Sequence, residues 1–248
     1  MIRIFFVWFL VFDLLLLWVN AYSQTVVYYD PDGNLRRIVD INSEGSKLFS
    51  KVGLKFVVTA DENSFNNAVK QYSPEYFILN SIIYQTKKKS LDVDASFVFE
   101  RNKKVTYTKR VVTFQEGIGI KDLGNSVLAS SFRDISDIVP IETRVLKVPK
   151  DLDALLAMKF KQADFALVSE SSIDVFKSIS PVDFGLLKVV YTSREIYNPV
   201  FCYVLGKGSL SKVREVERLL LTPEAKQFLS LMLFDSINND PKIISKVK

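Results

Sequence analysis

Apolar runs typical of strands alternate along the chain with stretches of helical spacing. The strand-like runs are rich in β-branched and aromatic residues and cover residues 25–29, 54–59, 76–79, 96–100, 105–114, 127–129, 143–148, 165–168, 186–191 and 200–205. Helical spacing occurs over residues 35–52, 65–72, 152–160, 213–221 and 224–233. This alternation predicts an α/β fold with βαβ units and a mainly parallel sheet.

The clearest predicted helix begins near the middle of the chain. Leu152, Leu155, Leu156 and Phe160 are spaced to share one face of a helix, and Asp151 precedes them as an N-cap. Two other segments depart from the α/β pattern. Residues 102–104 (NKK) separate two strand-like runs and predict a hairpin turn, and the basic tail from 238 to 248 is expected to fray.

The first residues have the order of a secretory signal. Arg3 precedes a stretch over residues 4–19 that is apolar apart from Asp13, and small residues follow at Ala21 and Ser23. We expect cleavage before Gln24, with cleavage after Ala21 as a second option. An uncleaved anchor is the alternative, although the stretch is shorter than the about 20 residues that a span needs. In either form, the bulk of the chain is predicted to be periplasmic or otherwise extracytoplasmic.

Composition removes several function classes. The chain has no His and one Cys, which argues against a Ser-His-Asp triad and a His-ligated zinc site and excludes an internal disulfide. Cys202 lies in an apolar run and is predicted to be a buried small hydrophobe. The net charge is +5, and the lysines at 87–89 and the basic residues at 103–110 are expected on solvated turns. Nucleic-acid binding is not predicted, because an export signal does not suit it.

Five segments, in this order, carry a family resemblance. They are residues 107–112 (YTKRVV), 119–129 (GIKDLGNSVLA), 153–158 (DALLAM), 163–168 (ADFALV) and 191–199 (YTSREIYNP). The chain resembles the periplasmic solute-binding proteins of ABC transporters with the type II fold, in the phosphate/phosphonate-binding branch. The resemblance covers almost the whole chain after the signal.

The resemblance implies two lobes that close over a ligand by a hinge motion. The first lobe would comprise residues 24–112 and 192–248, and the second residues 113–191, with residues 1–23 as the signal peptide. The second lobe is expected to be small, because the stretch from 130 to 142 is too short for the helix that the family has there. The family also places a His near the position of Leu152, which this chain lacks.

Strand ends and helix starts on both lobes supply the candidate ligand-binding residues. They are Tyr28, Tyr29, Asn80, Ser81, Tyr84, Ser130, Ser131, Arg133, Ser169 and Glu170. Hydroxyl, amide and guanidinium groups near helix N-termini suit an oxyanion. Each residue also has a purely structural interpretation, such as a buried ring, a helix cap, a turn or a solvated charge.

These observations leave two functions open. The first is an exported solute-binding protein that holds a small, phosphate- or phosphonate-like oxyanion and delivers it to an ABC transporter permease. Such a protein would use no cofactor and would not convert its ligand chemically. The second is an accessory or sensory envelope protein that retains the fold without a ligand, which the short second lobe and the missing His favour. An enzyme is not predicted, since no nucleophile–base pair stands out.

Overall fold

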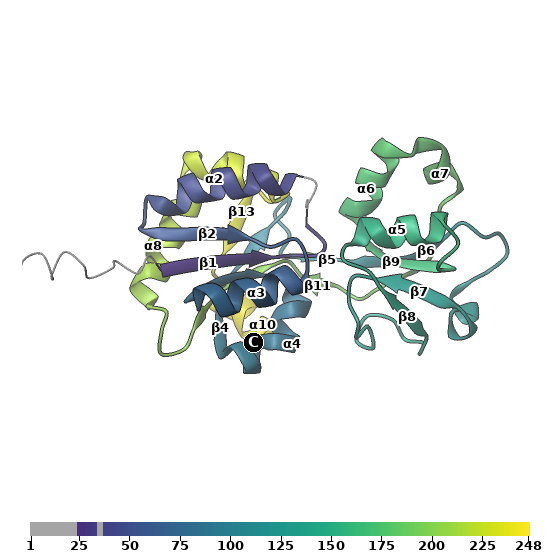
Figure 1. The fold of residues 1–248 in the computed structure, drawn as a ribbon, viewed down its shortest axis with the longest axis horizontal. Coiled ribbons are helices and arrows are strands. Elements are labelled where there is room, and N and C mark those ends of the chain that lie inside the picture. The colour runs from purple at the N-terminus through teal and green to yellow at the C-terminus, as the bar shows by residue number, and fades with distance from the viewer. Residues whose placement is uncertain (1–23, 34–36) are drawn as a thin grey trace, which may run out of the picture.

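The computed structural model describes residues 24–33 and 37–248 of the 248-residue chain. The predicted signal peptide, residues 1–23, lies outside the described residues. The described residues form two lobes that lie side by side and are joined by crossing segments (Figure 1). Among these residues, no helix is both long and apolar enough to cross a membrane.

The first lobe is built on a six-stranded sheet in the order β13-β4-β12-β3-β1-β2. Its strands are β1 (Gln24–Tyr29), β2 (Leu54–Val58), β3 (Tyr76–Leu79), β4 (Val93–Glu100), β12 (Val200–Val204) and β13 (Ser236–Asn238). β1 pairs in parallel with β2 and β3, whereas β12 pairs antiparallel with β3 and β4. The sheet is therefore mixed where the pattern predicted a mainly parallel one, because a returning strand inserts between β3 and β4.

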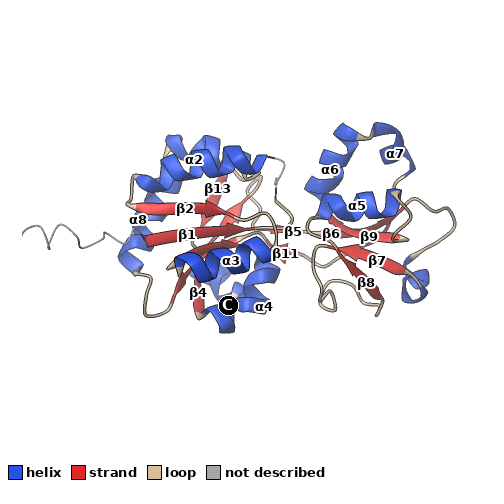
Figure 2. Ribbon diagram, viewed as in Figure 1, coloured by secondary structure: helices blue, strands red, loops and turns tan. Residues whose placement is uncertain are grey.

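Helices cover both faces of this sheet (Figure 2). They are α2 (Ile38–Ser50), α3 (Glu62–Tyr72), α4 (Ser81–Leu91), α8 (Leu210–Leu220), α9 (Lys226–Leu231), α10 (Pro241–Val247) and the 3₁₀ turn η3 (Pro223–Ala225). Alternate side chains of β1 point to opposite faces. Val26 and Tyr28 pack in one cluster with Phe49 of α2, and Val27 and Tyr29 pack in another with helix α3. Both faces of β1 are thus buried.

The second lobe has a five-stranded sheet in the order β10-β6-β9-β7-β8. Its elements are β6 (Lys109–Thr113), η2 (Ile120–Asn125), β7 (Val127–Ser130), β8 (Arg144–Lys147), α5 (Asp151–Lys159), β9 (Phe165–Ser169), α6 (Glu170–Ile179), α7 (Pro181–Leu186) and β10 (Lys188–Thr192). β6 lies in this sheet, whereas the expected boundary left residues 109–112 in the first lobe. Residues 131–143 form no helix, as the shortness of this stretch led us to expect.

A two-stranded antiparallel ribbon of β5 (Thr106–Tyr107) and β11 (Ile196–Tyr197) lies where the chain crosses between the lobes. The turn predicted at residues 102–104 exists: Arg101 and Lys104 form a bridge, and Asn102 and Lys103 both have positive φ. The hairpin predicted around it is wrong. β4 belongs to the first sheet, β5 to the ribbon and β6 to the second sheet, so the flanking runs do not pair with each other.

The end of the chain also differs from the expectation. Residues 241–247 form α10, whose Ile244 and Val247 are buried in the core of the first lobe, so the predicted fraying of this tail is wrong. Helical spacing also missed α4, α6 and α7. In α4 a polar, lysine-rich stretch separates Tyr84 from the next apolar residue, Leu91, which hides the helical period.

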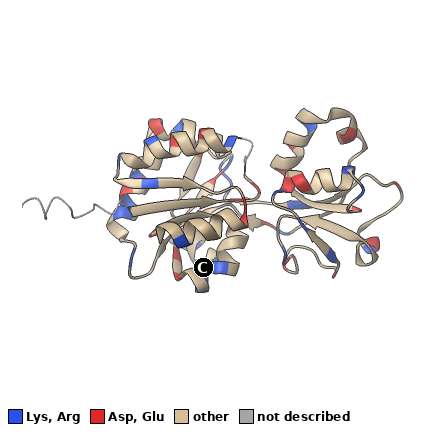
Figure 3. Cartoon of the chain, viewed as in Figure 1, with Lys and Arg blue, Asp and Glu red and all other residues tan. Residues whose placement is uncertain are grey.

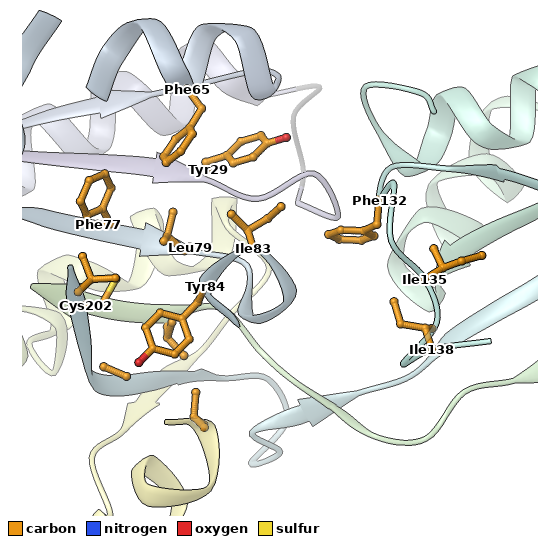
Figure 4. Close-up of a cluster of buried hydrophobic side chains, with 14 of the residues drawn as sticks. Tyr29, Phe65, Phe77, Leu79, Ile83, Tyr84, Phe132, Ile135, Ile138 and Cys202 are labelled. Carbon is orange, nitrogen blue, oxygen red and sulfur yellow. The ribbon is translucent and has the colours of Figure 1, made fainter. Parts of the chain in front are cut away.

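One cluster of buried side chains includes residues of both lobes (Figure 4). Tyr29 and Ile83 belong to the first lobe, and Phe132, Ile135 and Ile138 come from the helix-free loop of the second. Phe132 is drawn on the side of that loop that faces Tyr29 and Ile83, and it is almost fully buried. This loop therefore brings an apolar side chain to the junction between the lobes.

Candidate functional site

Polar residues at strand ends meet where the two lobes face each other. Asp30 and Asp32 follow β1, and Asn80 follows β3, all in the first lobe. Ser131 follows β7 and Ser169 ends β9 in the second lobe. Because the carboxyl ends of parallel strands meet at one edge of a sheet, each lobe presents its polar residues to the other lobe.

Lys109, the first residue of β6, links the lobes at the centre of this region. Its side chain is completely buried, and its Nζ donates to Asp32 Oδ1 at 2.7 Å and to Asp151 Oδ1 at 2.9 Å. The ammonium group also lies 4.6 Å from the centre of the Phe132 ring. A buried ammonium needs partners of this kind, since an unpaired charge in the interior is very costly.

The carboxylates around Lys109 receive further hydrogen bonds. Tyr107 of the ribbon donates its hydroxyl to Asp32 Oδ2 at 2.6 Å. Asn80 Nδ2 donates to Asp30 Oδ1 at 2.9 Å, while the Asn80 side-chain oxygen caps α4. Asp151 accepts from Ser131 Oγ at 2.7 Å and from the Ser169 backbone N–H at 2.6 Å. We call these residues the interlobe network: Asp30, Asp32, Asn80, Tyr107, Lys109, Ser131, Asp151 and Ser169.

The network holds three carboxyl groups, two of which bond the Lys109 ammonium, and the pKa values of the three separate accordingly. Burial, with Asp32 nearby, raises the pKa of Asp30 and that of Asp151 to about 7 each. Burial also opposes ionisation of Asp32, but Lys109 and hydrogen bonds outweigh it and lower the Asp32 pKa. Burial works against the charge of Lys109 as well, yet the two carboxylates raise its pKa. Of the three carboxyl groups, Asp32 therefore loses its proton most readily, while Asp151 ionises near neutral pH and also pairs with Lys109.

A cavity of about 390 Å³ lies beside the network. Its walls come from the first lobe at Asp30, Asn80 and Phe234, from the crossing segments at Thr106 and Tyr107, and from the second lobe at Ser169 and Ser171. The acidic residues in its lining are Asp30, Asp32, Glu170, Asp174 and Glu195, and the basic ones are Arg101 and Lys104. Acidic segments lie on both sides of the junction (Figure 3). Two of these acids are already ion-paired, Asp32 with Lys109 and Glu170 with Arg110, and burial raises the pKa of Asp30.

The described residues show no metal centre and no reactive thiol. Within residues 24–33 and 37–248, no group of three His, Cys, Asp or Glu side chains is placed to hold a metal ion. Cys202 is fully buried in β12, as predicted, and burial raises the pKa of its thiol.

Comparison with solved structures gives strong matches to solute-binding proteins. A binding-protein component of an ABC phosphonate transporter from Pseudomonas aeruginosa is 11% identical, with a TM-score of 0.71 over 90% of this chain and 84% of that one. PhnD1 from Prochlorococcus marinus, in complex with methylphosphonate, is 10% identical, with a TM-score of 0.70 over 92% of this chain and 96% of that one.

The chain has the type II periplasmic-binding-protein fold.

The resemblance found in the sequence is confirmed at the level of this fold. An arginine-bound mutant of ArgBP from T. maritima shares the fold more distantly, at 14% identity and a TM-score of 0.52 over 79% of this chain and 93% of that one. No family model and no curated protein matches the sequence. The periplasmic-binding-protein fold is therefore visible in the structure at identities too low for sequence matching.

Three of the ten candidate residues line the interlobe cavity of this fold, namely Asn80, Ser169 and Glu170. Ser131 is fully buried in the interlobe network beside the cavity. Glu170 lies at the start of α6 and forms an ion pair with Arg110 at 2.8 Å. These four residues are the candidates that the structure brings together.

Two other candidate serines hold the backbone near the site. Ser81 donates its hydroxyl to the backbone oxygen of Tyr197 in the ribbon. Ser130 is fully buried at the end of β7, and its Oγ accepts from the backbone N–H of Phe132 at 3.0 Å. Both side chains therefore hold segments that border the junction rather than lining the cavity.

The remaining candidates lie elsewhere. Tyr28 is fully buried on the face of β1 that packs with Phe49 of α2. Tyr29 stacks on Phe65, with its hydroxyl drawn toward the second lobe (Figure 4). Tyr84 lies in the core of the first lobe, where burial raises its pKa to about 12. Arg133 is exposed beside a separate hollow of the second lobe.

Sequence reasoning missed the charged centre of the network. Lys109 was expected on a solvated turn, but it is completely buried, so that expectation is wrong. Asp151 was interpreted as a helix cap, whereas its carboxylate bonds Lys109, Ser131 and Ser169. The sequence did contain a signal: Asp30 and Asp32 directly follow a buried strand, and Lys109 alternates with the buried Val111 in β6.

Proposed function

We propose that this chain is an exported solute-binding protein of an ABC-type transporter, which holds a small solute between its lobes without chemical conversion. The observation that carries the proposal is the cavity of about 390 Å³, because both lobes and the crossing segments contribute to its walls. A solute in that position touches both lobes at once, so its binding energy favours a closed arrangement. The cavity also falls within the size range of small-molecule sites, about 300–1,000 Å³.

The charge of the lining points to the kind of solute. Five carboxylates and two basic side chains surround the cavity. Two of these carboxylates are already paired, Asp32 with Lys109 and Glu170 with Arg110. The lining offers Asp174 and Glu195 to a cationic group, and Arg101 and Lys104 to an oxyanion. An amine or guanidinium group would be attracted, since opposite charges in a partly desolvated cleft gain more than they do in water. We propose a small polar solute that carries a cationic group, held by Asp174 and Glu195 of the lining.

A second candidate function rests on the interlobe network. Lys109 ties Asp32 of the first lobe to Asp151 of the second, so the lobes have polar contacts with each other that do not involve a solute. This arrangement suits an accessory or sensory envelope protein that keeps the fold and presents its surface to a partner. The two candidates differ in whether the cavity takes up a ligand.

Thermal shift measurements with defined probes separate these functions. The cationic probes are arginine and putrescine, and the anionic probes are methylphosphonate and inorganic phosphate. A probe at 100 times its Kd stabilises the fold by about 2.7 kcal/mol, which corresponds to a rise in Tm of roughly 5–10 °C for a chain of this size. We expect at least one cationic probe to raise the Tm and both anionic probes to leave it unchanged.

Matched variants locate the binding in the cavity. Asp174→Asn and Glu195→Gln each remove a carboxylate from the lining and should reduce the Tm shift that the cationic probe produces. Glu116 is an exposed acid that does not line this cavity, so Glu116→Gln should leave that shift unchanged. A shift by an anionic probe alone would contradict the cationic class but would keep the receptor. No shift by any probe would favour the ligand-free function.

A further inference from the structure

We propose that Asp151 acts as a built-in ligand: its carboxylate fills an anion-binding pocket of the second lobe and closes that pocket to free oxyanions. The proposal goes beyond the function proposed above. It concerns a buried corner next to the cavity, and it holds whether the cavity takes up a solute or not. Asp151 is almost completely buried and does not line the interlobe cavity.

The donors around Asp151 form the kind of set that binds an oxyanion. Ser131 Oγ donates to Oδ1 at 2.7 Å, and the Ser169 N–H donates to Oδ2 at 2.6 Å. Lys109 Nζ lies 2.9 Å from Oδ1 and 3.1 Å from Oδ2, so it serves both oxygens. A hydroxyl, a backbone N–H and an ammonium, all buried and aimed at one point, make strong charge-assisted hydrogen bonds to a negative group.

This use of Asp151 differs from ordinary helix capping. Asp151 is the first residue of α5, and the preceding residue, Lys150, makes no side-chain capping bond. The hydrogen bonds of the Asp151 carboxylate run instead to Lys109 in β6, to Ser131 after β7 and to Ser169 at the end of β9. The carboxylate therefore closes off a pocket formed by three other segments of the lobe.

The occupied pocket also connects the two lobes. Lys109 Nζ holds Asp151 and, from the same atom, bonds Asp32 Oδ1 of the first lobe at 2.7 Å. A ligand attached to the chain competes at an effective concentration in the millimolar range or above. A free carboxylate or phosphonate that binds these donors no more tightly than the side chain does cannot displace Asp151 at a lower concentration, so this position selects against such oxyanions in the wild-type chain.

Removing the side chain and supplying the carboxylate in solution tests the proposal. Asp151→Ala opens a gap of carboxylate size, which formate fits and benzoate does not. We expect formate to raise the Tm of this variant by about 3–6 °C at ten times its Kd, as a bound ligand does in a chain of this size. Benzoate at equal concentration should have no effect.

Two controls set the comparison. In the wild-type chain the Asp151 carboxylate already fills the pocket. In Asp151→Asn a side chain of the same shape fills it without the charge. The Tm of both proteins should therefore respond to formate no more than to benzoate. If Asp151→Ala does not fold alone, its yield of soluble monomer on dilution from urea is compared in formate and in benzoate, and a higher yield in formate is expected.

Equal effects of formate and benzoate on Asp151→Ala, in Tm or in refolding yield, would overturn the proposal. So would a formate response of the same size in the wild-type chain. Neither readout depends on a solute in the interlobe cavity, so a failure here leaves the proposed receptor function standing. Conversely, a failure of the thermal shift probes leaves the role of Asp151 intact.

Discussion

Replacing Lys109 by Met tests the interlobe network most severely. Met has a similar length but no charge, so the variant leaves Asp32 and Asp151 buried without the ammonium that bonds both of them. Removing one partner of a buried ion pair typically costs about 3–5 kcal/mol of unfolding free energy. We expect a loss in this range in urea denaturation, which corresponds to a fall in Tm of roughly 6–20 °C. The lobes should also separate, giving a larger radius of gyration in small-angle X-ray scattering.

Two further variants distinguish this effect from the loss of any lysine. Lys188→Met removes a surface ion pair with Glu116, and such pairs contribute about 0–1 kcal/mol. Combining Lys109→Met with Asp32→Asn and Asp151→Asn leaves no charge on these three side chains and should recover much of the loss, since neutral replacements of buried ion pairs are often tolerated. A loss below about 1 kcal/mol for Lys109→Met, with an unchanged radius of gyration, would refute the reasoning.

Two other predictions concern pH and packing. The pKa of Asp30 is raised from 3.8 to about 7, so the folded chain binds this proton more tightly than the unfolded chain does. The Tm of the wild-type chain should therefore fall as the pH rises from 5 to 8. In Asp30→Asn the Tm should fall less steeply over the same range. The chain has no His to titrate in that window, and an unchanged slope in the variant would contradict the assignment. Gly45→Ala places a Cβ 2.3 Å from the Phe56 ring and should cost about 1–3 kcal/mol in urea denaturation. Gly185→Ala, with open space around it, should cost nothing, and equal costs for both would contradict the packing argument.

The sequence was most informative where the signal is local. Asn80, Ser131 and Ser169 could be predicted near the site because each follows an apolar strand, and strand ends of an α/β lobe face the same edge. The α/β class was likewise predicted from a local signal, the alternation of strand-like apolar runs with stretches of helical spacing. The strand at β12 was predicted, but its antiparallel pairing could not be, since its partners are far away along the chain, and β13 was missed altogether.

The charged centre needed the folded structure. Lys109 is separated from Asp32 by 77 positions and from Asp151 by 42 positions, so no local pattern indicates that they meet. A lysine within a basic stretch is usually solvated, and only the pairing with two carboxylates allows this one to be buried. For the same reason, Asp151 could be mistaken for a simple helix cap. Long-range charge pairing thus decides the character of the junction.

Native mass spectrometry of the purified chain tests the central claim, uptake of a solute between the lobes, most directly. The protein is incubated with the small-molecule fraction of a cell extract and freed of unbound solutes before the measurement. The account predicts a discrete added mass on the wild-type chain, retained in Glu116→Gln and reduced in the Asp174→Asn, Glu195→Gln double variant. Bare protein under all conditions, or an added mass that the cavity variant keeps in full, would contradict it.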